Sequence, residues 1–493
     1  METIGFDNEA YLAMQSERIR ERVARFGKLY LEFGGKLFDD YHAARVLPGF
    51  RPDSKMRMLL ELKEQAELIV VISADDIEKN KRRGDLGITY DLDVMRLIDS
   101  FREYGLYVSG VVLTRCRGQQ AAQTFENRLQ SLGVRVYRHY PIDDYPADLP
   151  RIVSENGFGK NDYIETTRPI VVITAPGPGS GKMATCLSQL YHDHQRGIRA
   201  GYAKYETFPI WNLPLKHPIN LAYEAATVDL DDVNMIDPFH LEAYGETTVN
   251  YNRDVEIFPV LEAIFRQIFG DCPYKSPTDM GVNMVGCAIV DDEVCREASK
   301  QEILRRYYET ACAVKRGEAT SRELQKMEML LRSMQLEPEQ RRVVPAAQAV
   351  AQRTGNPAVA IELNDGTMIT GKTTSLMGPA CSALLNALKA LAGIAPQVDL
   401  ISPAVLAPIQ HLKVEHLGNR NPRLHTDEML IALSMSAVTN PTAELAMQEL
   451  DKLKGAQVHS TVILSQVDEK LLKKIGANVT CSPVYEGQRL FRK

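Results

Sequence analysis

The fold is decided by residues 169–183, PIVVITAPGPGSGKM, where a β-branched run ends in three spaced glycines and a lysine. Residues 182–196, which follow at once, have a helix-forming composition. The predicted order is therefore a strand, a glycine-rich turn and a helix N-terminus. Glycines let the backbone approach a ligand and turn successive N–H groups inward, and a helix N-terminus favours negative charge. The stretch predicts an α/β unit with a phosphate-binding loop.

Apolar strands and helical segments alternate around this stretch. We expect strands at 28–33, 68–74, 107–114, 134–140 and 198–205, and helices at 8–26, 54–66, 91–104 and 119–132. Continuous Val/Ile runs between helices are typical of a parallel sheet covered on both faces. The sequence therefore predicts a P-loop-like or Rossmann-like α/β domain over residues 1–288.

The remainder of the chain divides into two parts. Residues 291–316 and 321–334 have helical spacing and many charges, which predicts a helical subdomain over 289–343. Its charged face is expected to be solvated or to contact another copy in a homo-oligomer. Residues 344–493 begin with a helix, two short strands and an apolar helix at 380–391, which predicts a smaller C-terminal α/β domain.

Composition limits the class of protein. The 493 residues carry a net charge of −6, so the chain as a whole has no basic footprint for nucleic acid. The eight cysteines are dispersed without a C-x-x-C pair, which indicates reduced thiols. The N-terminus lacks an apolar signal segment, and no apolar run approaches the ~20 residues of a membrane span. We expect a soluble cytoplasmic protein that binds a small molecule.

The glycine loop departs from the P-loop consensus G-x-x-x-x-G-K-[ST] at two positions. Pro176 replaces the first glycine, and Met183 replaces the hydroxyl residue that would hold Mg²⁺. Ser180 or Thr185 is expected to supply the missing hydroxyl, and the alternative is a turn that only packs tightly. The expected cofactor is ATP with Mg²⁺, and the expected cofactor-binding residues are Gly177, Gly179, Ser180, Gly181, Lys182 and Thr185.

Other polar residues are candidates for catalysis and substrate binding. Asp229, in the acidic tract 223–240, would act as a second-motif acid or cap a helix at the surface. The clusters 250–254 and 274–279 have the composition of substrate clamps, and Lys204 ends the returning strand, where open α/β sheets bind ligands. No metal-ligating cluster is predicted. The candidate catalytic residues are Lys182, Asp229 and Arg253, and the candidate substrate-binding residues are Lys204, Asn252, Arg253, Lys275, Thr278 and Asp279.

Residues 366–373, GTMITGKT, satisfy the P-loop pattern in full. Their four variable positions are strand-like, however, and Asp365-Gly366 between two β-patterned segments indicates a hairpin. The hairpin and the helix after it resemble the opening of the cytidine-deaminase fold. Because Cys381 has no later C-x-x-C partner, the resemblance implies that topology without its zinc site.

Two further resemblances concern function. The glycine loop, its helix and Lys204 are similar to the P-loop synthetases. The whole chain resembles an uncharacterised bacterial family of roughly this length, classed as a conserved domain of unknown function, on residues 223–261, 274–286 and 419–428. This family likeness implies the α/β, helical and α/β order but no reaction. We expect a nucleotide-dependent ligase or kinase acting on a small acidic or phosphorylated metabolite. The alternative is a non-catalytic binder of a phosphate-bearing metabolite that acts through an oligomer.

Overall fold

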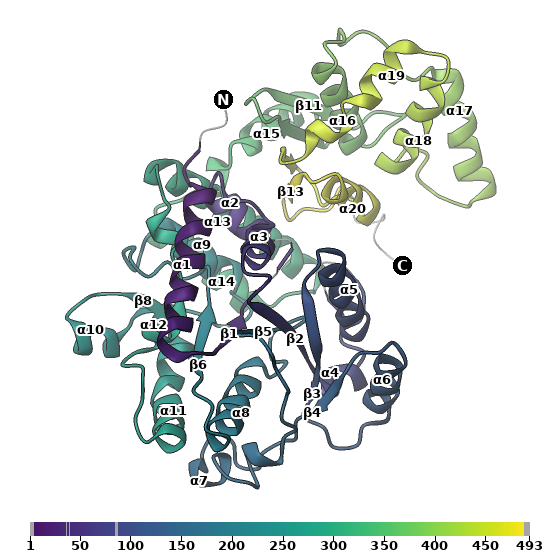
Figure 1. Ribbon diagram of the computed structural model, residues 1–493. Coiled ribbons are helices and arrows are strands. Elements are labelled where there is room, and N and C mark those ends of the chain that lie inside the picture. Colours follow the sequence, from purple (N-terminus) through teal and green to yellow (C-terminus); the bar gives the residue numbers. More distant parts are fainter. Residues whose placement is uncertain (1–3, 36, 39, 84–86, 488–493) are drawn as a thin grey trace. The chain divides into compact units, whose positions relative to one another are not determined.

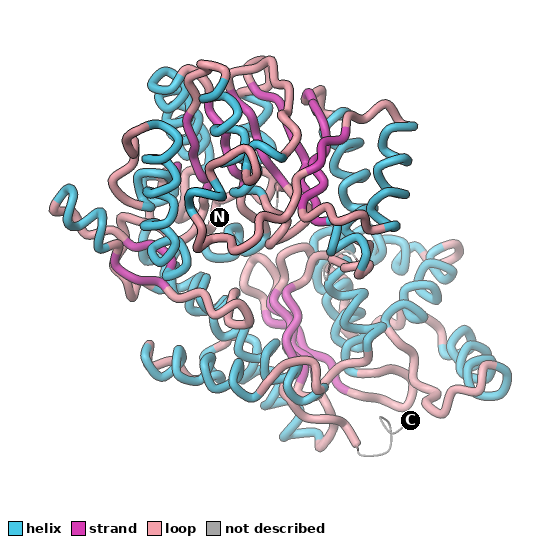
Figure 2. Tube along the Cα trace, turned by 90° about the horizontal axis from the view of Figure 1, so that it is seen from below, coloured by secondary structure: helices cyan, strands magenta, loops and turns pink. Residues whose placement is uncertain are grey.

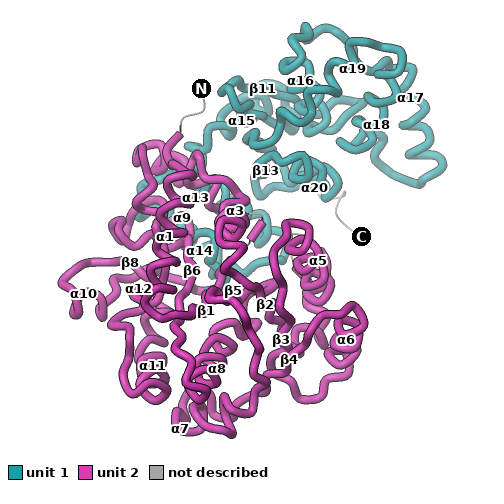
Figure 3. The backbone as a smooth tube through the Cα atoms, viewed as in Figure 1, with its two compact units in different colours: residues 1–3, 225–230, 300–493 teal, residues 4–224, 231–299 magenta. Residues whose placement is uncertain are grey.

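The computed structural model describes residues 4–35, 37–38, 40–83 and 87–487. The chain forms two compact units (Figure 3). The N-terminal unit comprises Ile4–Glu224 and Asp231–Ser299, and the C-terminal unit comprises Ala225–Leu230 and the described residues from Lys300 onward. None of the helices in the described ranges is long and apolar enough to cross a membrane. The division into three domains stays a prediction.

A seven-stranded sheet forms the centre of the N-terminal unit (Figure 1), in the order β4-β3-β2-β5-β1-β6-β9. All of its neighbouring strands are parallel. β1, β2 and β5 consist of buried residues, as expected for strands covered on both faces. The predicted parallel α/β sheet is therefore confirmed. Its strands are β1 (Leu29–Phe33), β2 (Ala66–Ser73), β3 (Tyr107–Thr114), β4 (Val136–Arg138), β5 (Ile170–Thr174), β6 (Gly201–Tyr205) and β9 (Gly281–Val282).

Helices pack on both faces of this sheet, and Figure 2 shows the strands flanked by helices. Successive side chains of a strand point to opposite faces. The hydroxyl of Tyr205 on β6 lies 2.5 Å from that of Tyr11 on α1, whereas Tyr30 on β1 donates to Asp193 on α8 at the other face. The helices are α1 (Asn8–Phe26), α2 (Tyr41–Val46), α3 (Ser54–Glu61), α4 (Ala74–Glu78), α5 (Tyr90–Glu103), α6 (Gln120–Ser131), α7 (Leu149–Ile152) and α8 (Lys182–Gln195).

The segment after β6 is more regular than its sequence pattern indicates. β7 (Asn234–Ile236) and β8 (Val249–Tyr251) form an antiparallel pair, and β9 joins the edge of the main sheet beside β6. Strands of two or three residues have no readable hydrophobic period, which is why sequence analysis missed them. The helices of this segment are α9 (Pro218–Ala226), α10 (Pro238–Tyr244), α11 (Asn252–Phe269) and α12 (Pro277–Met280).

Two charged helices follow, as the sequence predicts. α13 spans Asp292–Arg316 and α14 spans Ser321–Ser333. Gly317 ends α13 with a φ of +78°, a conformation that favours glycine. Thr320 and Glu323 form a capping box that begins α14.

The C-terminal unit contains a four-stranded mixed sheet in the order β11-β10-β12-β13. β10 is antiparallel to β11 and β12, and β12 is parallel to β13. The Asp365-Gly366 turn joins β10 to β11, so the hairpin expected there is confirmed. The elements are α15 (Val343–Thr354), β10 (Ala358–Glu362), β11 (Met368–Lys372), α16 (Pro379–Leu391), α17 (Pro403–His411), α18 (Thr426–Ala437), α19 (Pro441–Gln448), β12 (Gln457–Ser460), α20 (Gln466–Lys474) and β13 (Asn478–Cys481).

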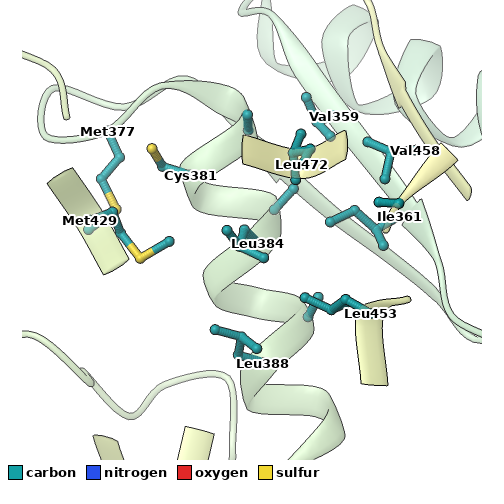
Figure 4. Close-up of a cluster of buried hydrophobic side chains, with 14 of the residues drawn as sticks. Val359, Ile361, Met377, Cys381, Leu384, Leu388, Met429, Leu453, Val458 and Leu472 are labelled. Atoms are coloured by element: carbon teal, nitrogen blue, oxygen red, sulfur yellow. The ribbon is translucent and has the colours of Figure 1, made fainter. Parts of the chain in front are cut away.

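The core of the C-terminal unit explains its formal P-loop motif. Leu384 and Leu388 of α16 lie in one buried apolar cluster with Val359 and other strand residues (Figure 4). A methyl group at Gly371 of β11 would lie 2.1 Å from the backbone nitrogen of Ala383 on α16. Gly371 is thus required by the close packing of helix on hairpin, and the motif has a structural explanation.

Candidate functional site

The glycine loop of the N-terminal unit joins the end of β5 to the start of α8. Gly179 and Gly181 have φ values of +75° and +96°, which a residue with a side chain rarely adopts. A methyl group at Gly177 would lie 2.2 Å from the Tyr90 hydroxyl, whereas at Gly179 it would meet no atom within 4 Å. The loop is therefore packed against the protein at Gly177 and open at Gly179.

Hydrogen bonds to carbonyl oxygens hold the loop in place. Thr114, the last residue of β3, donates to the carbonyl of Ser180 at 2.6 Å, and the Ser180 hydroxyl donates to the carbonyl of Gly177 at 2.8 Å. The Thr185 hydroxyl donates to the carbonyl of Gly181 at 3.0 Å. Because β3 and β5 flank β2, the loop leans over the end of β2 to reach Thr114.

The backbone N–H groups of residues 179–184 are left without an acceptor. Within the described part of the chain, no protein atom accepts a hydrogen bond from any of these six groups. Gly181 is the N-cap of α8 and has no side chain to cap it. Uncapped amides at the N-terminus of a 14-residue helix attract an anion.

Lys182, the first residue of α8, supplies a positive charge at the same end. Its side chain is partly exposed, and no carboxylate of the described residues pairs with its ammonium group. Burial raises the pKa of the Cys186 thiol, one turn further along α8; Glu32 raises it further, and Lys182 opposes this. The ammonium group thus lies close enough to act on the Cys186 side chain of α8.

The loop lacks the side chain that binds magnesium in the P-loop consensus. Met183 stands at that position and has no oxygen. The hydroxyls of Ser180 and Thr185 donate their hydrogens to backbone carbonyls, and their oxygen lone pairs stay available to a ligand. The described residues contain no group of three or more His, Cys, Asp or Glu side chains that could hold a metal ion. The loop therefore presents backbone donors for an anion without the consensus metal-binding hydroxyl.

A cluster of charged side chains lies on the α8 face of the sheet, at the carboxyl ends of β1 and β6. Lys204 is in register with Glu32, which accepts a hydrogen bond of 2.7 Å from Tyr202. The Lys204 ammonium lies 2.7 Å from Glu206 and 2.5 Å from Asp254 at the start of α11. Sequence analysis selected Lys204 for this edge and placed Asp254 in the separate 250–254 cluster, but it did not select Glu32 or Glu206.

Burial and charge set the protonation of this cluster. Burial raises the pKa of Glu206 to about 7, although Lys204 opposes the shift. Burial disfavours the charged form of Lys204, but Asp254 and Glu206 overcome it and raise its pKa. An ammonium group that stays charged beside a carboxyl group that titrates near neutral pH is suited to proton exchange.

The single tryptophan lies near this cluster. A methyl group at Gly281 would lie 2.4 Å from the ring of Trp211 and 3.4 Å from a carboxylate oxygen of Glu206. The indole and the carboxylate are therefore both close to Gly281, where β9 pairs with β6 at Lys204. The Glu206 side chain is only 6% exposed.

Two of the expected substrate-binding residues make contacts within their own region. Arg253 pairs with the buried Asp232 at 2.6 Å, and the side chain of Asn252 accepts from the backbone of Val233 at 3.0 Å. Both contacts hold the segment before β7 against the start of α11. Arg253 and Asn252 are adjacent in sequence to Asp254, so this segment borders the charged cluster.

The remaining candidates lie elsewhere. Thr278 donates to Asp237 at 2.7 Å, Asp279 accepts from Tyr244 and from the backbone of Lys275, and all of these residues surround the short helix α12. Asp229 is exposed and belongs to the C-terminal unit, whereas Lys182 belongs to the N-terminal unit. Of the expected residues, the loop residues 177–185 and Lys204 both follow or end strands of the parallel sheet, the loop after β5 and Lys204 near the end of β6.

The residues missed by sequence analysis carried only a partial signal. Lys204 and Glu206 are two residues apart at the end of a strand, a spacing that places both side chains on one face. Asp254 lies 48 positions further along the chain than Glu206, and only the packing of α11 brings it to Lys204.

Comparison with known proteins covers nearly the whole chain. Residues 4–335 match the family described as "Domain of unknown function DUF1846, N-terminal", and residues 339–491 match the corresponding C-terminal domain. A UPF0371 protein of Streptococcus pneumoniae (strain JJA) and one of Streptococcus thermophilus (strain ATCC BAA-491 / LMD-9) are each 56% identical over 494 residues, which cover 100% of both chains. Another, from Streptococcus pneumoniae serotype 2, is 57% identical over the same length. The resemblance drawn from three sequence tracts is confirmed.

Proposed function

For a chain that belongs to the DUF1846 family, we propose a nucleotide-dependent enzyme of the ligase or kinase type, whose loop 176–182 binds the phosphate groups of ATP. One observation carries the proposal: six consecutive backbone N–H groups, at residues 179–184, have no acceptor among the described residues. An anion would satisfy donors that the protein leaves unpaired, and the dipole of α8 would favour its charge.

Three features support phosphate as the anion. The open space at Gly179 admits a ligand, Lys182 lies beside the amides without a carboxylate partner, and the loop lies at the carboxyl edge of a parallel sheet. Strand, glycine turn, helix and returning strand follow one another as in P-loop proteins. When bound, ATP would supply a phosphoryl or nucleotidyl group for activation of an acid.

The acceptor side of the site belongs to β6 and the segment after it. Lys204 is 22% exposed at the sheet edge, and a small acidic or phosphorylated metabolite that binds there would compete with Glu206 and Asp254 for its charge. Asn252 and Arg253 border the same cluster, and they hold the segment before β7 in place. The proposed substrate is thus recognised between the loop and the start of α11.

Met183 favours a second candidate function. A loop that lacks the consensus magnesium-binding hydroxyl suits a protein that binds a phosphate-bearing metabolite without turning it over. Such a sensor would pass the signal through a homo-oligomer, and the phosphate site would be the same.

Isothermal titration calorimetry with ATP, with and without Mg²⁺, tests both candidates. We expect the wild type to bind ATP and Lys182→Ala to lose at least about tenfold in affinity, because one charge-assisted contact is removed. Lys63→Ala is the matched control, because Lys63 precedes the amino end of β2 and the loop follows the carboxyl end of β5. This variant should bind ATP like the wild type. Magnesium-dependent binding followed by ADP or AMP formation supports the enzyme, and metal-independent binding without turnover supports the sensor. Absence of ATP binding to the wild type refutes the ATP-dependent enzyme.

The C-terminal unit has its own proposal. We propose that it shares the topology of the cytidine-deaminase fold without the zinc chemistry. The antiparallel hairpin β10–β11 followed by α16 supports the topology. Cys381 argues against a ligand role, because it is buried and its thiol donates to the carbonyl of Leu424 at 3.0 Å.

A further inference from the structure

Three carboxyl groups surround one ammonium group at the carboxyl ends of β1 and β6, on the face of the sheet that α8 covers. Glu206 and Asp254 contact Lys204 directly, and Glu32 on the neighbouring strand acts on it electrostatically. The side chains of Glu206, Asp254 and Lys204 are 6%, 16% and 22% exposed. Ionisation of all three carboxyl groups would leave the cluster with an excess of negative charge in a poorly solvated place, so the cluster favours one additional proton.

The cluster is connected to the loop through α8. This helix begins at Lys182 and contacts β1, β5 and β6. The Cys186 thiol is influenced both by Glu32 and by Lys182, and Glu32 in turn influences Lys204. An anion held at the start of α8 therefore adds negative charge on the face of the sheet that carries Glu32, Lys204 and Glu206.

We propose that Glu206 is the proton-exchanging group of this site: its carboxylate binds one proton from solvent when an anion occupies the glycine loop, and releases it when the anion leaves. Lys204 and Asp254 are positioning residues: Lys204 contacts Glu206 directly, and Asp254 holds Lys204. The inference rests on the proposed function, because it requires an anion at the loop. In the loaded site Glu206 is then a neutral acid, able to donate its proton to the oxygen of a leaving group.

Several groups face Glu206 and set its response. Its burial alone would favour protonation, and its pKa is raised to about 7. Three charged or titratable groups interact electrostatically with Glu206 directly: Lys204 on β6, Asp254 on α11 and Tyr251 on β8. Glu32 on β1 interacts with Lys204, with Tyr202 and with Cys186. Lys182 interacts with Cys186. Lys204 is the only cation that contacts Glu206 among the described residues, so a new anion shifts Glu206 towards its neutral form.

The test is calorimetric titration of ATP without metal, near pH 7, in buffers of different ionisation enthalpy, which gives the number of protons taken up per ATP bound. Protons exchanged by ATP itself cancel in the difference between variants. Because the pKa of Glu206 is about 7, the group is already about half protonated near pH 7. We expect the wild type to take up at most about half a proton more than Glu206→Gln. Glu224→Gln is the matched control, since burial also raises the pKa of Glu224, which bonds the backbone of Asn234 instead.

Each outcome decides a different point. Loss of the additional uptake in Glu206→Gln but not in Glu224→Gln supports the inference. Equal uptake in wild type and Glu206→Gln overturns it and leaves the phosphate-binding proposal standing. Absence of ATP binding to the wild type overturns the proposed function, and this inference with it.

A second measurement covers the case in which Glu206→Gln does not fold. Infrared difference spectra of the wild type with and without ATP should show the appearance of a protonated carboxyl band. The band should move in Glu206→Asp, which keeps a carboxyl group, and stay in place in Glu224→Gln. A wild-type spectrum in which ATP binds without any such band overturns the inference.

Discussion

The hydroxyl of Thr114 donates a hydrogen bond of 2.6 Å to the carbonyl oxygen of Ser180, so the end of β3 holds the loop that follows β5. Both groups are buried. The bond occupies a carbonyl of the loop, whereas the backbone N–H groups of residues 179–184 have no acceptor among the described residues. We expect Thr114→Val to lower the free energy of unfolding by about 1 kcal/mol and to weaken ATP binding, because a buried carbonyl loses its donor.

Urea unfolding and calorimetry check this expectation. Thr114→Ser is the control, because it keeps the hydroxyl and should retain both stability and ATP affinity more closely than the valine variant. Unchanged ATP affinity in a folded Thr114→Val protein would show that this bond does not preorganise the loop.

The raised pKa of Glu206 predicts a loss of stability towards higher pH. The folded state keeps a proton up to about pH 7, whereas an ordinary glutamate loses it near 4.5, so between these values the folded state binds more protons than the unfolded chain. Stability must then fall as pH rises, by up to about 3 kcal/mol for this group. Glu206→Gln removes the group, so its stability relative to the wild type should increase from about pH 4.5 to about pH 7. Chemical unfolding at a series of pH values measures the difference, and a difference that is constant with pH would contradict the prediction.

His459 predicts the opposite dependence in the C-terminal unit. Burial, aided by Arg341, lowers the pKa of His459 to about 3, and its ring bonds Thr480 and Ser482. Below pH 6.5, the ordinary pKa of histidine, the unfolded chain binds a proton at this residue, whereas the folded chain does not until about pH 3. Stability should therefore fall with decreasing pH, by about 1.4 kcal/mol per pH unit for this group.

The His459→Gln variant should show a smaller slope of unfolding free energy against pH in this acid range. His416→Gln removes an exposed histidine and should leave the slope as in the wild type. Equal slopes in all three proteins would show that the pKa of His459 is the same in the folded and the unfolded chain.

Close packing at Gly371 predicts that a larger side chain there lowers stability strongly and leaves ATP binding unchanged. A methyl group there would meet the backbone of α16 at 2.1 Å, so Gly371→Ala should cost about 3 kcal/mol or more. Gly378→Ala is the control, since its nearest atom would lie at 3.7 Å. Thermal unfolding measures the effect. Loss of ATP binding in a folded Gly371→Ala protein would instead indicate that the P-loop motif at residues 366–373 binds nucleotide.

Much of the fold was readable from local patterns. The apolar run at 107–114 became β3 without a change of boundary, and the run at 169–175 became β5 with one residue less at each end. Such runs are readable because a strand buried on both faces must be apolar at every position. The Asp365-Gly366 turn was readable because few residues tolerate its backbone, and Gly366 has a φ of +85°.

The candidate site was readable only in part. The glycine loop and Lys204 were identifiable because a strand, turn and helix fix the loop within a short stretch of chain. Arg253 was assigned to a substrate clamp, but the structure pairs it with the buried Asp232. The pairing of Asp254 with Lys204 had no local signal, since α11 must first pack against the sheet.

The amino-acid sequence by itself determined the parallel α/β character of the N-terminal unit, the hairpin of the C-terminal unit and the loop with its uncapped helix, because these depend on hydrophobic period and on glycine conformations within a few residues. Only the tertiary structure decided that β5 lies between β2 and β1, that Thr114 holds Ser180, and that Glu32, Glu206 and Asp254 gather around Lys204. Those contacts join residues far apart in the chain, and their geometry follows from how helices and strands pack rather than from any local pattern.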